Sequence, residues 1–216
     1  MKKILLTGFY AMLLALPVQL FAVGPIDIDA GIKLGANFNK INGKYWDNGY
    51  KANMTFGLFG GLGFGKVGVQ AEALFAQSSY VTGTGFRDMY EDAINPSNYS
   101  DSSGKINVSR IQIPVLINYR IFKILKLQAG PQFSGVIHVK DKNAFLKDAK
   151  SMFKSGWDGV VGLQANFPFG IHASARYIFG LSDFNNSSAR HPITGAALSD
   201  AWRNSTFQIT VGYSFL

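Results

Sequence analysis

Large apolar side chains alternate with small or polar ones along most of the chain after residue 25. In the stretch 26–38, isoleucine, leucine, alanine and phenylalanine occupy the even positions, while aspartate, lysine, asparagine and glycine occupy the odd ones. An α-helix would scatter these apolar positions around its circumference, whereas a β-strand collects them on one face. The same pattern recurs in segments 54–64, 67–77, 109–119, 125–139, 157–167, 171–181 and 205–215. The pattern therefore predicts eight β-strands, most of them near or above the ~9–11 residues that a tilted membrane-spanning strand requires.

The connections between the predicted strands are alternately short and long. Three are tight, at 65–66, 121–123 and 168–170. Long polar stretches rich in Asn, Ser, Asp and Gly separate the other strands, at 39–53, 81–105, 140–156 and 182–204. Short turns at one rim and long loops at the other are typical of an outer-membrane β-barrel. The predicted fold class is all-β, an eight-stranded up-and-down antiparallel transmembrane β-barrel with both termini on the periplasmic side.

Aromatic residues favour the same interpretation. If the first strand runs outward, the apolar faces carry aromatic residues at two heights. The outer girdle is Phe38, Trp157, Phe179 and Phe207, and the periplasmic girdle is Phe64, Tyr119, Phe167, Tyr213 and Phe215. Membrane interfaces select such girdles. A soluble β-sandwich is the main alternative because its strands also alternate, but it predicts neither girdles nor long loops at one end only.

The first 22 residues have a different pattern. Two lysines precede an apolar run, and Ala22 supplies a small residue at which cleavage could occur. This layout predicts a cleaved secretory signal peptide at 1–22, which leaves 23–216 as the outer-membrane β-barrel domain. The alternative is a single transmembrane anchor, but Pro17 and Gln19 leave the apolar run short for a membrane span.

Composition and charge narrow the function classes. The 216 residues have a formal net charge of +8, yet only 16% are charged, against roughly a quarter in soluble domains. Lysine and arginine are scattered and form no basic face, which argues against nucleic-acid binding. The chain has no cysteine, which excludes disulfides and thiol chemistry.

Several charged residues on the polar faces of the strands are expected in the lumen. They are Lys33, Glu72, Arg110, Arg120, Lys126, Asp158 and Arg176. Side chains just fill an eight-stranded barrel, so these charges need partners, and Glu72 has Arg110 and Arg120 on the next strand. The set fits either a narrow polar channel or a hydrogen-bonded plug, and the plug is favoured. Inward-facing glycines leave some space for a water-filled passage.

Catalysis has little support in the sequence. Small barrels that modify lipids need a histidine beside a nucleophile near the outer rim. His172 starts a strand at the periplasmic end, His138 is expected on the lumen side of the outer rim, and His191 lies in a Ser- and Asn-rich loop. These histidines show neither a nucleophile motif nor metal-ligand spacing. No catalytic residue, cofactor or metal site is therefore predicted.

One loop segment, 143–154, has apolar residues at helical spacing with lysines between them. It fits two interpretations equally. One is an amphipathic helix at the outer interface, whose lysines meet lipopolysaccharide phosphates. The other is a cap over the barrel mouth.

Five short stretches, taken in order, resemble a known family. "IQIPVLINY" at 111–119, "LQAGPQFSGVI" at 127–137, "DGVVGLQ" at 158–164, "RYIFGLSDF" at 176–184 and "TVGYSFL" at 210–216 resemble the PorT-like outer-membrane β-barrel family of Bacteroidetes-type bacteria. The resemblance implies an outer-membrane barrel of about this size. It does not imply one settled activity; the founding member of that family is linked to a secretion and gliding apparatus.

The last predicted strand, 205–215, would leave an open apolar edge unless it paired with 26–38. A last strand that ends in an aromatic residue also resembles the signal read by the outer-membrane assembly machinery, although here Leu216 follows Phe215. We therefore expect a non-enzymatic outer-membrane protein that acts by loop-mediated binding or within an envelope complex. A small porin-like channel is the alternative, and a lipid-modifying enzyme is less favoured. The expected partners are outer-membrane lipids and lipopolysaccharide, the assembly machinery, and an envelope or secretion complex.

Overall fold

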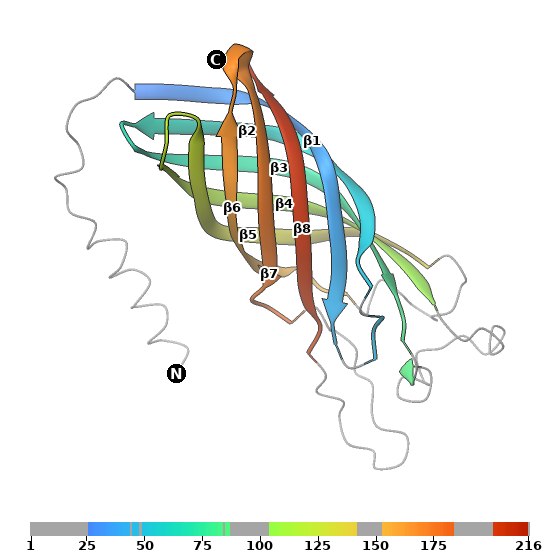
Figure 1. The fold of residues 1–216 in the computed structure, drawn as a ribbon. Helices are drawn as coiled ribbons and strands as arrows, with labels where there is room; N and C mark the ends of the chain where they lie inside the picture. The colour runs from blue at the N-terminus through green and yellow to red at the C-terminus, as the bar shows by residue number, and fades with distance from the viewer. Residues whose placement is uncertain are drawn as a thin grey trace, which may run out of the picture.

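Eight antiparallel strands pair in sequence order and close into a barrel, which confirms the predicted fold class (Figure 1). The computed structural model describes residues 26–43, 45–47, 49–83, 85–86, 104–141, 153–183 and 201–215. The strands are β1 (Ile26–Asn42), β2 (Lys51–Phe64), β3 (Val67–Val81), β4 (Lys105–Arg120), β5 (Leu125–Asp141), β6 (Gly156–Asn166), β7 (Ile171–Gly180) and β8 (Arg203–Ser214). The predicted signal peptide, 1–22, lies outside the described residues. Among the residues described, no helix is long and apolar enough to cross a membrane.

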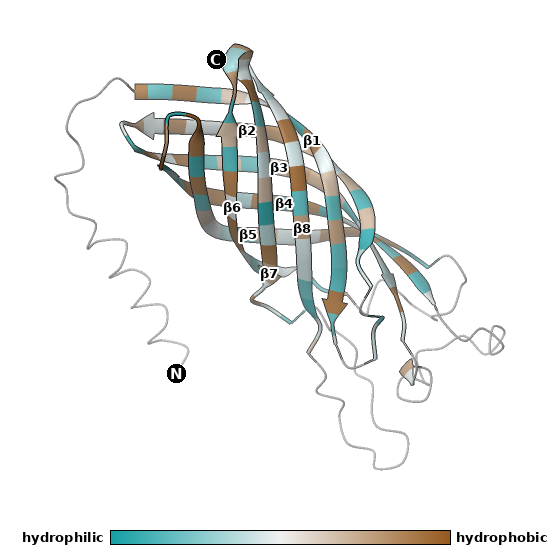
Figure 2. Cartoon of the chain, in the orientation of Figure 1, coloured by the Kyte–Doolittle hydropathy of each residue, from teal (hydrophilic) through white to brown (hydrophobic). Residues whose placement is uncertain are grey.

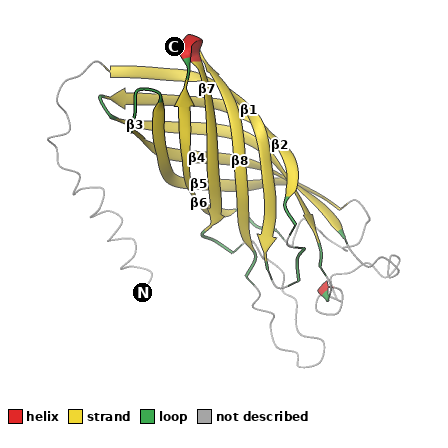
Figure 3. Ribbon diagram, viewed as in Figure 1, coloured by secondary structure: helices red, strands yellow, loops and turns green. Residues whose placement is uncertain are grey.

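The barrel closes between its first and last strands. β1 pairs with β2 along one edge and with β8 along the other, from Gly31↔Ser214 to Asn42↔Arg203. Neither strand is therefore left with an open edge, the condition for a sheet to exist in lipid. The end of β8 lies beside the short 3₁₀ turn that joins β6 to β7, at the end of the barrel opposite the long connections (Figure 3).

Side chains sort between lipid and lumen along the middle of the barrel. Leu34 and Ile209 are 59% and 55% exposed, whereas Lys33, adjacent to Leu34 in sequence, is 2% exposed. Figure 2 shows the resulting alternation of hydrophobic and hydrophilic residues along the strands. Because apolar side chains face outward and polar ones inward, this part of the barrel suits a surrounding lipid phase.

The alternation inverts at the long-loop end. Ile41, Tyr80 and Ile106 point into the barrel there and are only 1–2% exposed, while Lys40 and Lys105 lie on the outer face. Polar residues outside and apolar residues inside suit water, so these strand ends extend beyond the lipid-facing band. The strands therefore extend into the predicted loops 39–53 and 81–105. Alternation continues in these extensions, but apolar residues face inward and polar residues face outward.

A β-bulge changes the facing of residues near the end of β5. On β4, Ser109 and Arg110 are consecutive, but their partners on β5 are His138 and Val136. Ile137 is therefore an extra residue on β5 with no partner on β4. Ile137 and His138 are both exposed on the outer face, and Val139 packs inward. The prediction that His138 lies on the lumen side is therefore wrong, because alternation cannot be counted through an inserted residue.

Candidate functional site

A buried ion cluster crosses the middle of the lumen. The carboxylate of Glu72 on β3 accepts a hydrogen bond from Lys33 Nζ on β1 at 2.5 Å. It accepts two more from Arg176 on β7, each at 2.7 Å and each at a different carboxylate oxygen. The three side chains are 0–1% exposed. The bidentate geometry and the second cation offset the cost of burying these charges.

Amide side chains connect this ion cluster to the rest of the barrel wall. Arg176 Nε donates to Gln128 Oε1 on β5 at 2.9 Å. Gln128 Nε2 in turn donates to Asn118 on β4 at 2.9 Å and to Gln164 on β6 at 3.1 Å. Six of the eight strands are thereby joined through the lumen. A network satisfied in this way rigidifies the interior, which favours the plug over the channel.

The remaining predicted lumen charges lie at other levels. Arg110 lies nearer the outer mouth, with its guanidinium carbon 5.6 Å from the centroid of the Tyr80 ring. Asp158 also lies in the outer half, where its carboxylate accepts a hydrogen bond from Ser134 Oγ at 2.5 Å. Arg120 and Lys126 line the periplasmic mouth.

The expected pairing of Glu72 with Arg110 or Arg120 is wrong. Arg110 lies opposite Ala76, four residues along β3 from Glu72 toward the loops, and Arg120 lies past the other end of that ladder. At roughly 3.3 Å per residue, four residues separate Glu72 from Arg110 by about 13 Å along the strand. Adjacent strands thus place these charges at different heights, and the partners of Glu72 come instead from β1 and β7.

Aromatic residues from all four long connections meet at the outer mouth. Trp46 follows β1, Phe86 follows β3, Phe153 precedes β6 and Trp202 precedes β8, and each is 0–5% exposed. The ring of Trp46 lies 4.9 Å from that of Trp202, 5.3 Å from that of Phe86 and 6.1 Å from that of Phe153. The strand residues Ile41, Tyr80, Ile106 and Val108 complete the cluster. We call this set the aromatic cap, and its packed rings close the outer mouth.

Hydrogen bonds hold the ends of these connections to the barrel. The backbone nitrogen of Asp47 donates to the Val81 carbonyl at 2.9 Å, and that of Trp202 donates to Asp183 Oδ1 at 2.8 Å. Of the predicted amphipathic segment 143–154, the structure describes only the last two residues, and Phe153 belongs to the cap. The sequence suggested a cap only for segment 143–154. At the other three connections the signal is an aromatic residue near the base of each one, Trp46, Phe86 and Trp202.

The periplasmic mouth holds an open cavity of about 590 Å³. At its rim, Arg120 donates to Asp27 Oδ2 at 3.3 Å, and Lys126 lines its wall. His172 lies at its inner end, edge to face with Phe59 at 4.8 Å between ring centroids. The residues lining the cavity include none of the three members of the ion cluster, so the cavity stops short of that cluster.

Two of the inward-facing glycines, Gly57 and Gly212, leave no open space beside them. A Cβ at Gly57 would lie 2.0 Å from the carbonyl oxygen of Ala73, and one at Gly212 would lie 2.1 Å from His172 Nε2. Backbone and the histidine ring therefore already fill the space beside these two glycines. The passage that the glycines suggested has no room at these positions.

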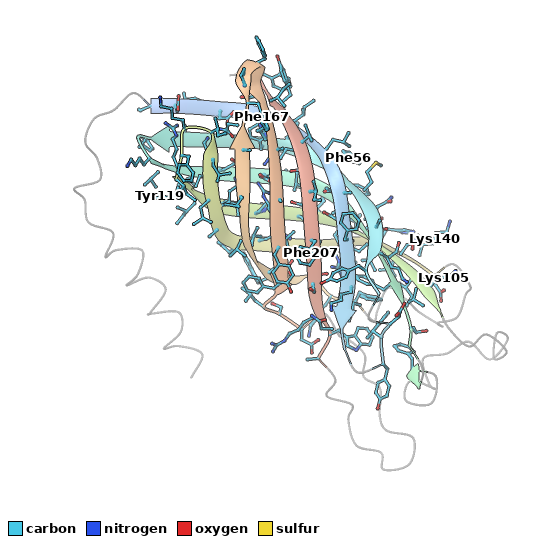
Figure 4. The ribbon with its side chains drawn as sticks, viewed as in Figure 1. Phe56, Lys105, Tyr119, Lys140, Phe167 and Phe207 are labelled. Carbon is cyan, nitrogen blue, oxygen red and sulfur yellow. The ribbon has the colours of Figure 1, made fainter. Side chains whose placement is uncertain are left out.

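The predicted aromatic girdle residues lie on the outer face. Trp157 and Phe207 are 53% and 49% exposed in the outer set, and Tyr119 and Phe167 are 48% and 49% exposed in the periplasmic set. Figure 4 shows Tyr119 and Phe167 toward the short-turn end and Phe207 nearer the loops. The other members, also outward-facing, are Phe38, which is half-buried, and Phe179, Phe64, Tyr213 and Phe215.

Two tyrosines extend the outer girdle and were not predicted. The ring of Tyr177 lies 4.9 Å from that of Phe207, and the ring of Tyr50 lies 5.6 Å from it on the other side. Their hydroxyls lie 2.9 and 3.4 Å from Ser205 Oγ. An apolar ring with a hydrogen-bonded hydroxyl suits a membrane interface. Tyr50 falls in a predicted loop, so its facing could not be inferred from alternation.

The described histidines do not share a site. His138 faces outward, His172 lies in the lumen, and His191 lies outside the described residues. A base and a nucleophile must lie within hydrogen-bond reach of each other. Ser109 lies opposite His138, but among the described residues no hydroxyl is hydrogen-bonded to His138 or to His172 Nε2. Over the described part of the chain, no group of three or more His, Cys, Asp or Glu side chains could hold a metal ion.

The barrel is closed, and it has an apolar outer band, aromatic residues at two heights and a filled polar lumen. These features define an integral outer-membrane β-barrel protein. A family model described as "Outer membrane protein beta-barrel domain" matches residues 19–186, and the chain belongs to this family. The protein is accordingly located in the bacterial outer membrane. No curated protein matches the chain.

Several solved structures are similar to this chain. The attachment invasion locus protein Ail of Yersinia pestis is 17% identical, with 87% of this chain and 98% of that chain covered and a TM-score of 0.43. Neisserial surface protein A is 9% identical over 89% and 100% of the two chains, with a TM-score of 0.48. OprG from Pseudomonas aeruginosa is 13% identical over 88% and 95%, with a TM-score of 0.45.

Proposed function

We propose that this protein is a non-conducting, non-enzymatic outer-membrane barrel that acts through its outer connections, as a binding protein or an accessory component of an envelope complex. The observation that carries the proposal is the aromatic cap, because one aromatic residue from each long connection is packed into it. Anchoring all four connections to one core pre-organises the outer surface, which lowers the entropic cost of binding a partner.

The filled lumen supports the same proposal. A pore needs a continuous polar path, whereas here the Glu72 cluster crosses the lumen and the cap covers the outer mouth. A lipid-modifying enzyme needs a base beside a nucleophile at the outer rim. Ser109 lies opposite His138 at that rim, but no side-chain hydrogen bond joins these two described residues, and the described outward faces of β3, β4 and β5 carry no acidic side chain that could orient the imidazole.

The resemblance to the PorT-like family suggests the kind of complex. Its founding member is linked to a secretion and gliding apparatus, so we infer a secretion-related envelope complex as the partner. Outer-membrane lipids, lipopolysaccharide and the assembly machinery that inserts the barrel are further partners of this proposal.

Photo-crosslinking in native outer membranes tests the proposal. A photoreactive residue in place of Asn186, in the β7–β8 connection, is expected to give a discrete adduct with an envelope protein. The matched control replaces Lys123, in a short turn at the periplasmic end, and is expected to give no such adduct. Adducts from position 123 alone, with none from any of the four outer connections, would contradict the proposal.

A further inference from the structure

Three nitrogen-bearing side chains share one patch on the outer face of β4 and β5. The bulge at Ile137 turns His138 and Lys140 outward, where Lys140 lies opposite Asn107 and Lys105 lies two residues further along β4. Lys105, His138 and Lys140 are all exposed. Figure 4 shows Lys105 and Lys140 at the loop end of these strands, past the band that carries Phe56.

The height of this patch matches a lipid headgroup. Ile111 and Ile137, 44% and 45% exposed, are the last apolar residues on the outer faces of these two strands before the polar region. Lys140 is three residues beyond Ile137, roughly 10 Å along the strand. Lysine stems lie along apolar surface while their ammonium groups reach polar surroundings. The patch therefore begins where the hydrocarbon ends.

The charge of the patch is of one sign. The outward faces of β3, β4 and β5, which the structure describes in full, carry no acidic side chain, and within the described part of the chain neither Lys105 nor Lys140 forms an ion pair. Asn107 lies between the two lysines and is held by Ser79, whose Oγ lies 3.0 Å from Asn107 Oδ1. Elsewhere on the outer rim, Lys40 lies against the Tyr50 ring, with Nζ 5.0 Å from its centroid.

We propose that Lys105, Lys140 and His138 form a binding site for the phosphate of a phosphorylated glycolipid of the outer leaflet. Two ammonium groups and an imidazole N–H share this outer face at headgroup height, and they match the charge and the acceptor oxygens of a phosphate monoester. The glycolipid's acyl chains would lie against the apolar outer face of β4 and β5. This site faces the membrane; it rests on the lipopolysaccharide partner named in the proposed function, and it does not depend on what the outer connections bind.

Titration of the folded, full-length protein in detergent with purified diphosphorylated lipid A tests the site. Wild type is expected to bind it at least about tenfold more tightly than dephosphorylated lipid A. The double variant Lys105→Gln, Lys140→Gln is expected to lose this preference. The double variant Lys66→Gln, Lys123→Gln removes the same charge at the periplasmic turns and is expected to bind as wild type does. Heat-modifiable migration on a gel confirms that each variant is folded.

Two outcomes would overturn the site. Equal weakening in both double variants would mean that net charge alone attracts the lipid. Competition by inorganic phosphate at the same concentration as lipid A would mean that the patch recognises free phosphate rather than the lipid. Neither result would affect the proposed role of the outer connections, which the crosslinking at position 186 tests separately.

Discussion

At the scale of single residues, the interior is organised around one carboxylate. Glu72 neutralises one of two cations that approach it from β1 and β7, and all three side chains are excluded from solvent. Removing one partner of such a buried set leaves an uncompensated charge, which costs more than the interaction itself gains. The stability of the barrel should therefore depend strongly on this one residue.

Replacing Glu72 with alanine should destabilise the barrel by about 3–5 kcal/mol, because Lys33 and Arg176 are then buried without a counter-charge. Glu72→Gln should cost less, since the amide oxygen still accepts one of these hydrogen bonds. Equilibrium unfolding in urea, with the barrel folded in lipid vesicles, measures both values. Gln208→Ala, which removes a buried but neutral lumen side chain, is the control and should cost less than Glu72→Ala. Equal losses in Glu72→Ala and Gln208→Ala would show that the ion cluster has no special role.

The sequence predicted that Lys33, Glu72 and Arg176 face the lumen, because period-two alternation settles which face a strand residue occupies. It did not predict that they meet. That contact depends on barrel closure and on the reach of Arg176 across the interior to Glu72. The alternation within one strand predicts neither how the barrel closes nor how high each residue lies relative to residues on other strands. The arginines on the neighbouring strand, Arg110 and Arg120, were therefore the wrong partners for Glu72.

At the scale of elements, two irregularities change the faces of the strands. The apolar pattern inverts beyond the lipid-facing band. For this reason Ile41 fell in a predicted loop and Tyr80 lay beyond the predicted strand 67–77, although both are buried in strands. The bulge at Ile137 then reverses the facing of His138. Regular alternation thus predicted the membrane-spanning part of each strand but not the part that extends from it.

Single cysteines should report the bulge directly, because the natural chain has none. Cysteines at positions 138 and 140 should react rapidly with a water-soluble maleimide, since both residues are exposed on the outer face. A cysteine at position 139 should react at least about tenfold more slowly, because Val139 packs against the aromatic cap. Labelling rates on folded protein measure this order. Faster labelling at 139 than at 138 and 140 would mean that the alternation is unbroken.

The aromatic cap should control the outer connections as a unit. Trp46→Ala removes the ring that contacts Phe86, Phe153 and Trp202, and loss of a buried tryptophan costs about 3–5 kcal/mol. We expect external protease to cut the outer connections faster in this variant while the barrel core stays resistant. Trp157→Ala, which removes a tryptophan from the lipid-facing girdle, should leave those cleavage rates unchanged. Similar rates for wild type and Trp46→Ala would show that the cap does not hold the connections.

At the scale of the whole molecule, the protein is a closed barrel whose interior is blocked at two levels. The cavity of about 590 Å³ at the periplasmic mouth ends before the Glu72 cluster, and the aromatic cap covers the other mouth. Strand number, order and closure were all predictable from the sequence, because lipid demands paired edges and apolar outer faces. The two blocking layers were less predictable, since each joins residues from strands and connections far apart in the chain.

Single-channel recording in planar lipid bilayers tests the central claim, a sealed lumen, most directly. Inserted protein, shown to be folded by its heat-modifiable migration, should give no conductance steps above the bilayer background. Reproducible, ion-selective steps from the same preparation would contradict the account and would establish the small channel in its place.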